Sequence, residues 1–370
     1  MHMCGRITRY MGEETSALPE ESRKKILIID GHSLAHRAYH ALPVTLTRPD
    51  GTPTNAVLGF CNMLVKLLEQ EKPDAVVCAF DAPEPTFRHQ QYEEYKATRR
   101  PMDDALRVQM PVVREAAAAF GLEVLELPGW EADDIIGSVA SQAEKAGFEA
   151  LIVTGDRDAL QLVSDSVKVL LTKKGISEFD EFGREQVIAK YGFGPELIPD
   201  LKGLMGDASD NIPGVPGIGE KTATKLILEF GPVESIIAAA HSIKQERVRN
   251  ALLEHADAAR ESKELATIDT NAPIDFDLDA CCALRRDDSQ LRAFLERQGF
   301  RSLITRLRLR KQPSDLQAGL FDSLETEAAG QVELAEAGRF AFHVTTSGRV
   351  TPGCEVKELV FCAGDLRACV

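Results

Sequence analysis

Short apolar runs alternate with longer amphipathic segments along the first half of the chain. The runs KILIID, DAVVCAFD, LEVLEL, FEALIVTGD and VKVLL are typical of short buried strands. Helical periodicity separates most of them, as in NAVLGFCNMLVKLLEQ, PVVREAAAAFG and EADDIIGSVASQAEKAG. Such an alternation predicts an α/β fold with a mostly parallel sheet that is flanked by helices.

The strand pattern disappears near residue 195, and helical periodicity dominates the chain from there to about residue 310. We therefore expect an α/β core over residues 25–194 and a helical lobe over residues 195–310. Residues 1–24 are polar and lack a period, which predicts a disordered extension. Residues 311–330 have the composition of a linker. Two strand-like runs follow in residues 331–370, which are too few to bury a core unaided.

The composition is that of an acidic protein with no membrane segment. A net charge of −15, from 43 basic and 58 acidic residues, argues weakly against nucleic acid as a partner, unless many carboxylates serve to hold metal. The eight cysteines show no C-x-x-C spacing, which argues against zinc and is typical of reduced thiols. No apolar run could span a bilayer and no secretory signal is present. These features predict a cytoplasmic protein.

Three of the predicted strands end in aspartate, namely at Asp30, Asp81 and Asp156. Ligands of open α/β sheets bind outside the carboxyl ends of the strands, so these three carboxylates should converge on one crevice. Six further acids lie in neighbouring segments: Glu131, Asp133, Asp134, Asp158, Asp207 and Asp210.

Each of these acids has an ordinary explanation when it is taken alone. Acids in the first turn of a helix favour its dipole, and aspartate is common in turns. Nine carboxylates in one crevice would nevertheless repel each other strongly unless cations neutralised them. Oxygen ligands favour Mg²⁺ or Mn²⁺, and two such ions about 3.5–4 Å apart suit phosphodiester hydrolysis.

The segment IPGVPGIGEKTA combines a glycine-rich turn with the start of a helix. Gly217 and Gly219 precede a helix that we predict from about Glu220, and free N–H groups at a helix start bind phosphate. Lys221 and Lys225 lie one turn apart and add positive charge. Contacts of this kind carry no base information. A plain helix–turn–helix is the alternative explanation.

A second basic segment, FRHQQYEEYKATRR, places aromatic side chains among cations. Such a mixture suits the binding of a single nucleic-acid strand through stacking and phosphate contact. An ordinary solvated helix explains the pattern equally well. The residues that carry the first interpretation are Arg88, Tyr92, Tyr95, Lys96, Arg99 and Arg100.

Five segments together resemble the 5′-nuclease domains of bacterial DNA polymerases I, which belong to the flap-endonuclease superfamily. They are IIDGHSLAHRAYHAL, AFDAPEPTFRHQQYEEYKATRR, GWEADDIIG, VTGDRDALQLV and GDASDNIPGVPGIGEKTA. The resemblance covers about residues 25–310. It implies a PIN-like nuclease core, a helix–three-turn–helix DNA-binding lobe and an arch over the active site. The implied activity is divalent-metal-dependent 5′→3′ exonuclease and flap-endonuclease cleavage of DNA, in primer removal and repair.

The resemblance also implies roles for individual residues. All nine acids named above correspond to metal-binding carboxylates. Lys96 and Arg99 correspond to cations at the scissile phosphate, Arg37 lies near the site, and His36 stands where relatives often carry tyrosine. The hairpin loop from Gly214 to Gly219 corresponds to one that grips duplex DNA and holds a monovalent cation such as K⁺. The expected DNA-binding residues are Arg88, Tyr95, Arg100, Gly214, Gly217, Gly219, Lys221, Thr222 and Lys225.

The end of the chain resembles the first strand of a 3′→5′ exonuclease-like domain. His343 and Thr345 stand at its two acidic positions, so we expect no metal binding there, and the chain stops before any polymerase fingers or palm. In the linker, Gln317 to Phe321 (QAGLF) resembles peptides that bind bacterial sliding clamps, although incidental apolar residues are the simpler explanation.

Two other functions compete with a DNA nuclease. A PIN-type ribonuclease would share the core, but a loop that grips a duplex serves little purpose on unstructured RNA. A non-catalytic DNA-binding module would have no need of nine repelling carboxylates. A comparison of cleavage of a flapped DNA duplex and of unstructured RNA distinguishes a DNA nuclease from the ribonuclease. Measurement of divalent-ion binding distinguishes a nuclease from the non-catalytic module.

Overall fold

The structure is a computed structural model that describes residues 23–48, 50–173, 175–176, 178–282 and 286–310, and the backbone of residues 340–346, 356–363 and 366–369. The chain divides into two compact units, Met1–Arg310 and Lys311–Val370. Of the expected extension over residues 1–24, residues 1–22 lie outside the described residues. The whole linker, with the segment from Gln317 to Phe321, also lies outside them.

The first unit is built on a six-stranded sheet in the order β3-β2-β1-β4-β5-β6. Its first five strands run parallel, as the sequence predicts, and β6 pairs antiparallel with β5. The sequence analysis did not predict β6, a short edge strand. The bounds are β1 (Lys25–Asp30), β2 (Ala75–Phe80), β3 (Glu123–Glu126), β4 (Glu149–Thr154), β5 (Val167–Thr172) and β6 (Phe179–Phe182).

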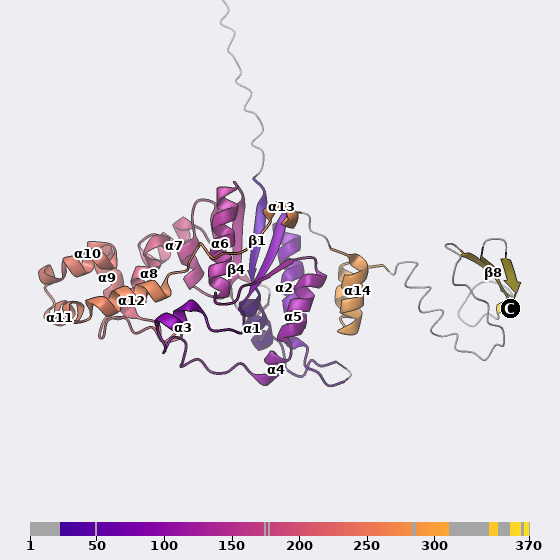
Figure 1. Cartoon of the computed structure of the whole chain (residues 1–370), viewed down its shortest axis with the longest axis horizontal. Coiled ribbons are helices and arrows are strands. Elements are labelled where there is room, and N and C mark those ends of the chain that lie inside the picture. Colours follow the sequence, from indigo (N-terminus) through magenta and orange to yellow (C-terminus); the bar gives the residue numbers. More distant parts are fainter. Residues whose placement is uncertain are drawn as a thin grey trace, which may run out of the picture. The chain divides into compact units, whose positions relative to one another are not determined.

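Helices cover both faces of this sheet (Figure 1). Successive residues of a strand point to opposite faces. Leu27 and Ile29 of β1 therefore pack in one hydrophobic cluster with α1 (Gly31–Ala41), α2 (Asn55–Glu71) and α5 (Met110–Ala119). Ile26 and Ile28 pack in the other with α6 (Ala132–Lys145). β1 is thus buried on both faces, and its carboxyl end holds a fixed position.

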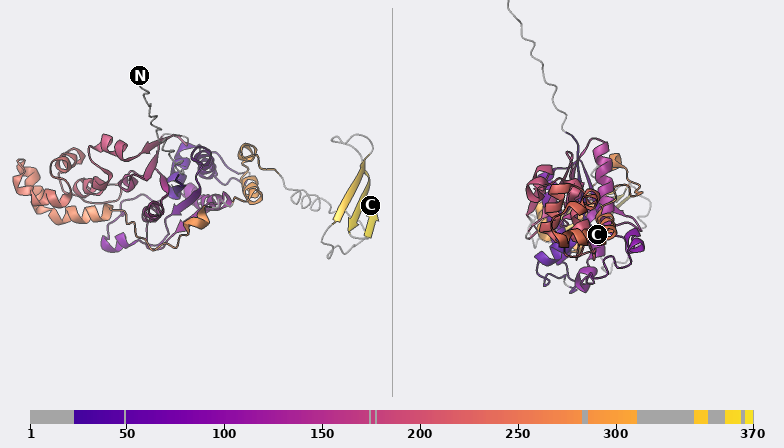
Figure 2. Two further views of the ribbon diagram at one scale, coloured as in Figure 1. Left: turned by 90° about the horizontal axis from the view of Figure 1, so that it is seen from above. Right: turned by 90° about the vertical axis from the view of Figure 1, so that its left-hand side faces the viewer.

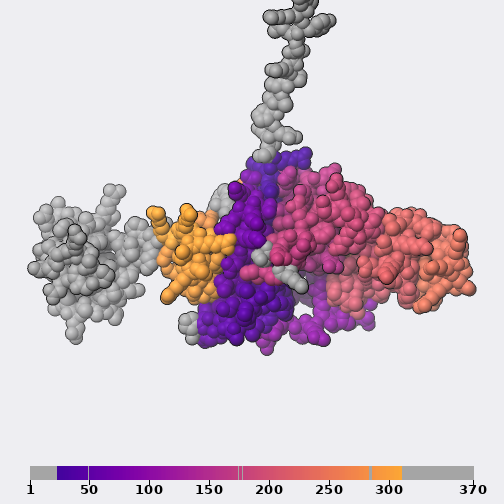
Figure 3. Space-filling model, turned by 180° about the vertical axis from the view of Figure 1, so that it is seen from behind, coloured from indigo at the N-terminus to yellow at the C-terminus, as the bar shows by residue number. Residues whose placement is uncertain are grey.

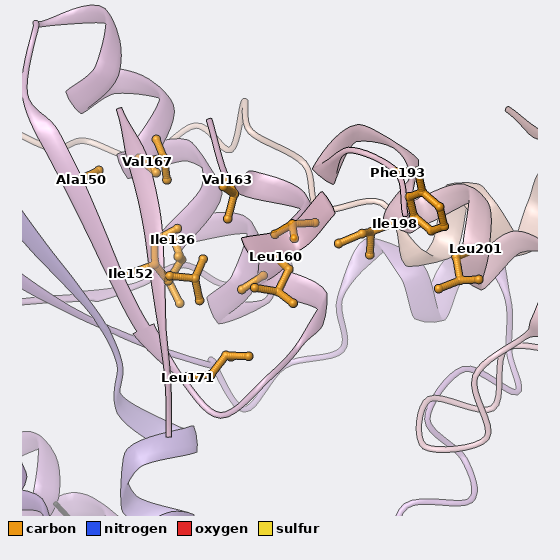
Figure 4. Close-up of a cluster of buried hydrophobic side chains, with 14 of the residues drawn as sticks. Ile136, Ala150, Ile152, Leu160, Val163, Val167, Leu171, Phe193, Ile198 and Leu201 are labelled. Carbon is orange, nitrogen blue, oxygen red and sulfur yellow. The ribbon is translucent and has the colours of Figure 1, made fainter. Parts of the chain in front are cut away.

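The helical lobe begins with α8 and continues the core of the sheet without a break. Leu160 joins the side chains of the sheet, such as Ile152 and Leu171, to Ile198 and Leu201 of α8 (Figure 4). The segment ERVRNALLEHADAARESKELATI was expected to be one helix, but it forms two, α11 and α12, because His255 leaves the helical conformation at φ −115°. The helices of the lobe are α8 (Ile198–Met205), α9 (Glu220–Phe230), α10 (Val233–Ala238), α11 (Glu246–Glu254) and α12 (Ala256–Ala266), and α7 (Arg184–Tyr191) precedes them. Figure 2 shows α9 to α12 gathered at one end of the first unit.

The last helices of the first unit return to the α/β core. Leu291 and Phe294 of α14 (Asp288–Arg297) lie in the same buried cluster as Val113 and Phe120. Figure 3 shows this part of the chain, in orange, against the indigo and purple core. α13 (Leu278–Cys281) and α15 (Arg301–Arg306) also pack on core clusters. These helices therefore belong to the core, although the sequence analysis assigned them to the lobe.

The second unit contains three antiparallel strands in the order β7-β8-β9. Two of them fall in the runs that the sequence predicts as strands. They are β7 (Phe340–Thr346), β8 (Val356–Ala363) and β9 (Leu366–Cys369). His343 and Thr345 lie in β7, in register with Val360 and Glu358. None of the helices that the structure describes has the length and apolarity needed to cross a membrane.

Candidate active site

A cavity of about 790 Å³ opens at the carboxyl edge of the sheet. It lies where the strand order reverses between β1 and β4, the point at which open α/β sheets bind their ligands. Five of the nine predicted carboxylates line it, as do four of the predicted cations. These residues are Asp30, Asp81, Glu131, Asp133 and Asp156, with Arg37, Lys96, Arg99 and Arg100.

Asp30 is the most firmly held of the five carboxylates. It caps the N-terminus of α1 by accepting a hydrogen bond from the N–H of Ser33 at 2.9 Å, and the hydroxyl of Thr154 on β4 donates to its other oxygen at 2.7 Å. Its exposed fraction is only 6%. Burial raises the pKa of Asp30 to about 7, and repulsion from Asp81 and Asp156 adds to the increase.

The neighbouring carboxylates share this electrostatic environment. Asp81 follows β2 and accepts a hydrogen bond at 2.9 Å from the N–H of Ala132, the first residue of α6. Asp133 lies in the first turn of the same helix. Burial raises the pKa of Asp133 well above its ordinary range, and repulsion from Asp156 and Asp30 adds to it. The carboxylates from three strand ends and one helix start therefore meet, as the sequence predicts.

Two of the predicted cations are bound to carboxylates of the same set. The ammonium of Lys96 lies 2.7 Å from Glu131, and the guanidinium of Arg99 lies 2.5 Å from Asp210. The N–H of Lys96 also donates to the carbonyl of Asp210 at 2.9 Å. Lys96 adopts φ 56°, a conformation that non-glycine residues seldom adopt and that is common near active sites. The segment that carries the cations is thus joined to the loop after α8.

A second acidic pair lies beside the cavity and contains a lysine that the sequence analysis missed. Lys202 of α8 forms ion pairs with both Asp158, at 2.7 Å, and Asp207. Burial raises the pKa of Asp158 to about 6, and repulsion from Asp156 contributes. A single lysine inside the apolar segment IPDLKGLM was the available signal, because a lysine rarely enters a buried helix face without a partner.

Asp134 and Arg88 lie elsewhere than the sequence analysis expected. Asp134 is fully buried, and Arg88, at 3% exposed, binds its two oxygens at 2.7 Å each. Arg88 also donates to the carbonyls of Leu265 and Thr267 at the end of α12. No oxygen of Asp134 faces the cavity, and the guanidinium of Arg88 cannot reach DNA. The pair therefore joins α3 (Phe87–Gln91), α6 and the lobe as part of the scaffold.

Tyr95 is likewise buried, although it was expected to stack on a DNA base. Its ring is 3% exposed, and its hydroxyl donates to Glu131 at 3.1 Å. Burial and the charge of Glu131 raise the pKa of Tyr95. The phenol therefore stays protonated and positions a carboxylate of the cavity.

Six further side chains line the cavity, and of these the sequence analysis had singled out His36 alone. The residues are His32, Ser33, His36, His40, Met102 and Thr172. The N–H of Asp81 donates to the ring of His32 at 3.1 Å, which fixes that ring at the cavity edge. His36, which the resemblance singled out, is half-buried here, and burial lowers its pKa.

The hairpin loop between α8 and α9 contains glycines of two kinds. Gly217 and Gly219 donate no backbone hydrogen bond to the part of the chain that the structure describes, so their N–H groups remain available. The N–H of Gly214 instead donates to the hydroxyl of Ser262 at 3.0 Å, which removes it from the expected phosphate contacts. Lys221 and Lys225 are exposed at the start of α9, and Thr222 is half-buried between them.

Replacement of Gly214 by alanine should lower the free energy of unfolding by about 3 kcal/mol, from left-handed strain and overpacking together. Gly214 has φ 63°, and a Cβ there would lie 2.2 Å from the backbone nitrogen of Gly206. Gly219→Ala is the matched control, because nothing lies within 4 Å of a Cβ at that position. Urea denaturation measures both variants. Equal losses would contradict this explanation.

The carboxylate set fits hydrated divalent ions better than a closed metal cage. Among the described residues, no three His, Cys, Asp or Glu side chains are grouped closely enough to hold a metal ion by themselves. Mg²⁺ usually keeps several waters and takes substrate phosphates as ligands, so it needs few direct protein contacts. Burial, with a smaller contribution from repulsion between the carboxylates, raises the pKa values of Asp30 and Asp133, and a bound cation would favour the charged form of both groups.

Two family models match consecutive parts of the chain. The model described as 5′-3′ exonuclease, N-terminal resolvase-like domain, matches residues 25–192. The model described as 5′-3′ exonuclease, C-terminal SAM fold, matches residues 193–290. Together they account for the sheet, the cavity and the helical lobe.

Curated relatives and solved structures agree with this match. DNA polymerase I of Bacillus caldotenax is 46% identical over 285 residues, which cover 77% of this chain and 32% of the relative. DNA polymerase I of Mycobacterium tuberculosis (strain ATCC 25618 / H37Rv) is 40% identical over 356 residues, which cover 95% of this chain and 37% of the relative. The chain thus spans about a third of the length of these relatives.

The solved structures confirm the fold. A T5 5′-exonuclease with bound divalent metal ions (zinc) has a TM-score of 0.57 at 21% identity, and covers 74% of this chain and 99% of its own. A bacteriophage T5 D15 flap endonuclease in a pseudo-enzyme-product complex with DNA and metal ions has a TM-score of 0.56 at 22% identity, and covers 74% and 98%.

Proposed function

Since this chain belongs to the 5′-3′ exonuclease family, we propose that it is a divalent-metal-dependent 5′ nuclease that cleaves branched DNA. It acts as a 5′→3′ exonuclease and a flap endonuclease, in primer removal and repair in the cytoplasm. The observation that carries this proposal is the cavity at the strand-order reversal, where five carboxylates and four cations face the same space.

The carboxylates of the cavity would hold Mg²⁺ or Mn²⁺. When bound, such ions make a water nucleophilic near neutral pH and neutralise charge on the phosphate. The residues that would hold them are Asp30, Asp81, Glu131, Asp133 and Asp156, and Asp158, Asp207 and Asp210 would act beside them. The metal ions in the T5 nuclease structures support this assignment.

The cations of the cavity bind the scissile phosphate. Lys96 and Arg99 hold Glu131 and Asp210 in the present structure, so a phosphate must compete with these carboxylates. Arg37 and Arg100 line the same space and add positive charge. Cations preorganised in this way stabilise charge that develops on the phosphate during cleavage.

The hairpin loop binds the duplex through its phosphates and without base readout. The free N–H groups of Gly217 and Gly219, followed by Lys221, Thr222 and Lys225, form the contact surface. K⁺ binding by this loop is part of the proposal. A separate part of the proposal is that the segment from Gln317 to Phe321 binds a sliding clamp. A peptide of this sequence that shows no affinity for the clamp would contradict it.

Digestion of an end-labelled 5′-flap substrate tests the proposed function. We expect Mg²⁺-dependent release of short products, and complete loss of cleavage when EDTA removes the ion. An unstructured RNA of equal length serves as the competing substrate and should remain intact. Preferential cleavage of the RNA would favour a PIN-type ribonuclease, and DNA binding without cleavage of either substrate would favour a non-catalytic module.

A further inference from the structure

A second cavity, of about 480 Å³, adjoins the catalytic cavity. The two share Arg37, Gly155 and Thr172 as lining residues, so one opens beside the other at the carboxyl edge of the sheet. We call the second cavity the Arg157–Lys190 groove, after two cations that line it. The groove reaches from the TGDRD segment across β5 and β6 to the end of α7.

Some cations of this groove form an ion pair with a carboxylate and others do not. Lys173 forms an ion pair with Asp180 at 2.6 Å. Arg157 stands between two metal-site candidates in the sequence, but its exposed guanidinium forms no ion pair or hydrogen bond within the part of the chain that the structure describes. The ammonium of Lys190 has no acidic partner within ion-pair distance there either.

Arg157 and Lys190 lie close enough to repel each other. Burial lowers the pKa of Lys190, and the charge of Arg157 lowers it further, against the opposing attraction of Asp180 and Glu220. The ammonium of Lys190 also lies over two aromatic rings, 5.0 Å from the ring centre of Phe182 and 5.3 Å from that of Tyr191. Four cations line the groove in all (Arg37, Arg157, Lys173 and Lys190) against two carboxylates (Glu178 and Asp180), so its local charge favours an anion.

We propose that the Arg157–Lys190 groove binds the sugar-phosphate backbone of the DNA strand that continues from the scissile phosphodiester. This inference rests on the proposed nuclease function, because the groove is continuous with the catalytic cavity through Arg37. Phosphates along a strand recur at a short spacing, so a strand that leaves the cavity presents the next ones to Arg157 and Lys190. The contact is to phosphate and carries no base preference.

The test compares a double variant, Arg157→Gln/Lys190→Gln, with a matched control, Lys72→Gln/Lys145→Gln. The control makes the same change in charge at exposed lysines that precede β2 and β4, on the opposite edge of the sheet. Fluorescence anisotropy measures the Kd of each full chain for a 5′-flap duplex in EDTA, over a series of salt concentrations.

We expect the groove variant to bind the duplex about tenfold or more weakly at 0.1 M salt. Its plot of log K against log salt should lose about 1.4–1.8 units of slope, since each released cation contact contributes about 0.7–0.9. The control should retain both values. An unchanged Kd and slope in the groove variant would overturn the proposal, as would a wild-type protein that binds no DNA.

Shortened duplexes identify the strand. One substrate lacks the 5′ flap and another lacks the upstream strand. The affinity difference between wild type and groove variant should vanish for the duplex without the 5′ flap, the part of the cleaved strand that leaves the cavity, and should persist for the duplex without the upstream strand, which holds no scissile phosphodiester. A difference that persists in every duplex would show general charge attraction and would overturn the proposal. A polyglutamate peptide that loses affinity while DNA binding stays intact would assign the groove to an acidic protein instead.

The same series keeps the two proposals apart. Mg²⁺-dependent cleavage of the flap by the wild-type protein is recorded on the same preparation. If the wild type does not cleave DNA but the groove variant binds DNA more weakly than the wild type, the nuclease activity is rejected and DNA binding by the groove is retained. Normal cleavage with unchanged binding would reject the groove alone.

Discussion

An Asp133→Asn/Asp156→Asn variant is expected to cleave 5′-flapped DNA with Mg²⁺ about 100-fold or more slowly than the wild type. Mutation of groups that only support the ligands of a metal site already lowers activity by up to about 100-fold. Both side chains line the catalytic cavity. Asparagine keeps the size of each side chain, and at position 156 its oxygen can still accept the 2.8 Å hydrogen bond from the N–H of Asp158. The loss should therefore come from missing negative charge and not from a damaged fold.

Single-turnover rates measure this loss, while anisotropy without divalent ions should show DNA affinity at least equal to that of the wild type. Thermal unfolding of the metal-free variant should occur at or above the wild-type temperature, since repulsion on Asp30 is relieved. Asp165→Asn/Asp279→Asn, at exposed acids away from the cavity, is the matched control. Turnover within tenfold of wild type in the cavity variant would exclude Asp133 and Asp156 from metal binding.

Arg88→Met is expected to lower the free energy of unfolding by about 3–5 kcal/mol, because it leaves the carboxylate of Asp134 buried without its partner. Arg88 forms two 2.7 Å hydrogen bonds to Asp134 and lies 3.5 Å from Glu131. The N–H groups of Glu131 and Asp269 also donate to Asp134. Loss of the guanidinium therefore weakens the connection between α6 and the end of the lobe.

Urea denaturation measures the effect, and two further variants identify its cause. Lys168→Met removes the partner of Glu181 at the exposed surface. Solvent screens this ion pair, so its loss should lower the free energy of unfolding by only about 0–1 kcal/mol. Arg88→Met/Asp134→Asn removes both charges and should lose less than the single variant. A loss for Arg88→Met no larger than that for Lys168→Met would mean that the buried pair contributes nothing specific.

The sequence predicted the parts of the site that are set by local pattern. Apolar runs identify buried strands, and parallel strands bring their carboxyl ends to one edge, so Asp30, Asp81 and Asp156 could be placed together before any coordinates. The start of α9 after Gly219 followed in the same way from the glycine-rich turn.

Partners that are distant in the sequence could not be predicted. An acid in the first turn of a helix suits a metal ligand, a helix cap or half of a buried ion pair, and nothing near Asp134 shows that Arg88 reaches it from 46 positions away. Lys202 likewise meets Asp158 only because α8 packs beside that segment. The return of α14 to the core depends on tertiary packing, which helical periodicity does not specify.

The two halves of the catalytic cavity differ in how firmly the fold holds them. Its acidic side is built on β1 and β4, which are central strands that are hydrogen-bonded along both edges. Its basic side, with Lys96 and Arg99, is a run of turns that is held by ion pairs to Glu131, at the start of α6, and to Asp210, in the loop after α8. If the proposed function is correct, a DNA phosphate that enters this cavity must replace Glu131 and Asp210 as the partners of Lys96 and Arg99, so binding depends on how readily these two cations exchange carboxylate for phosphate.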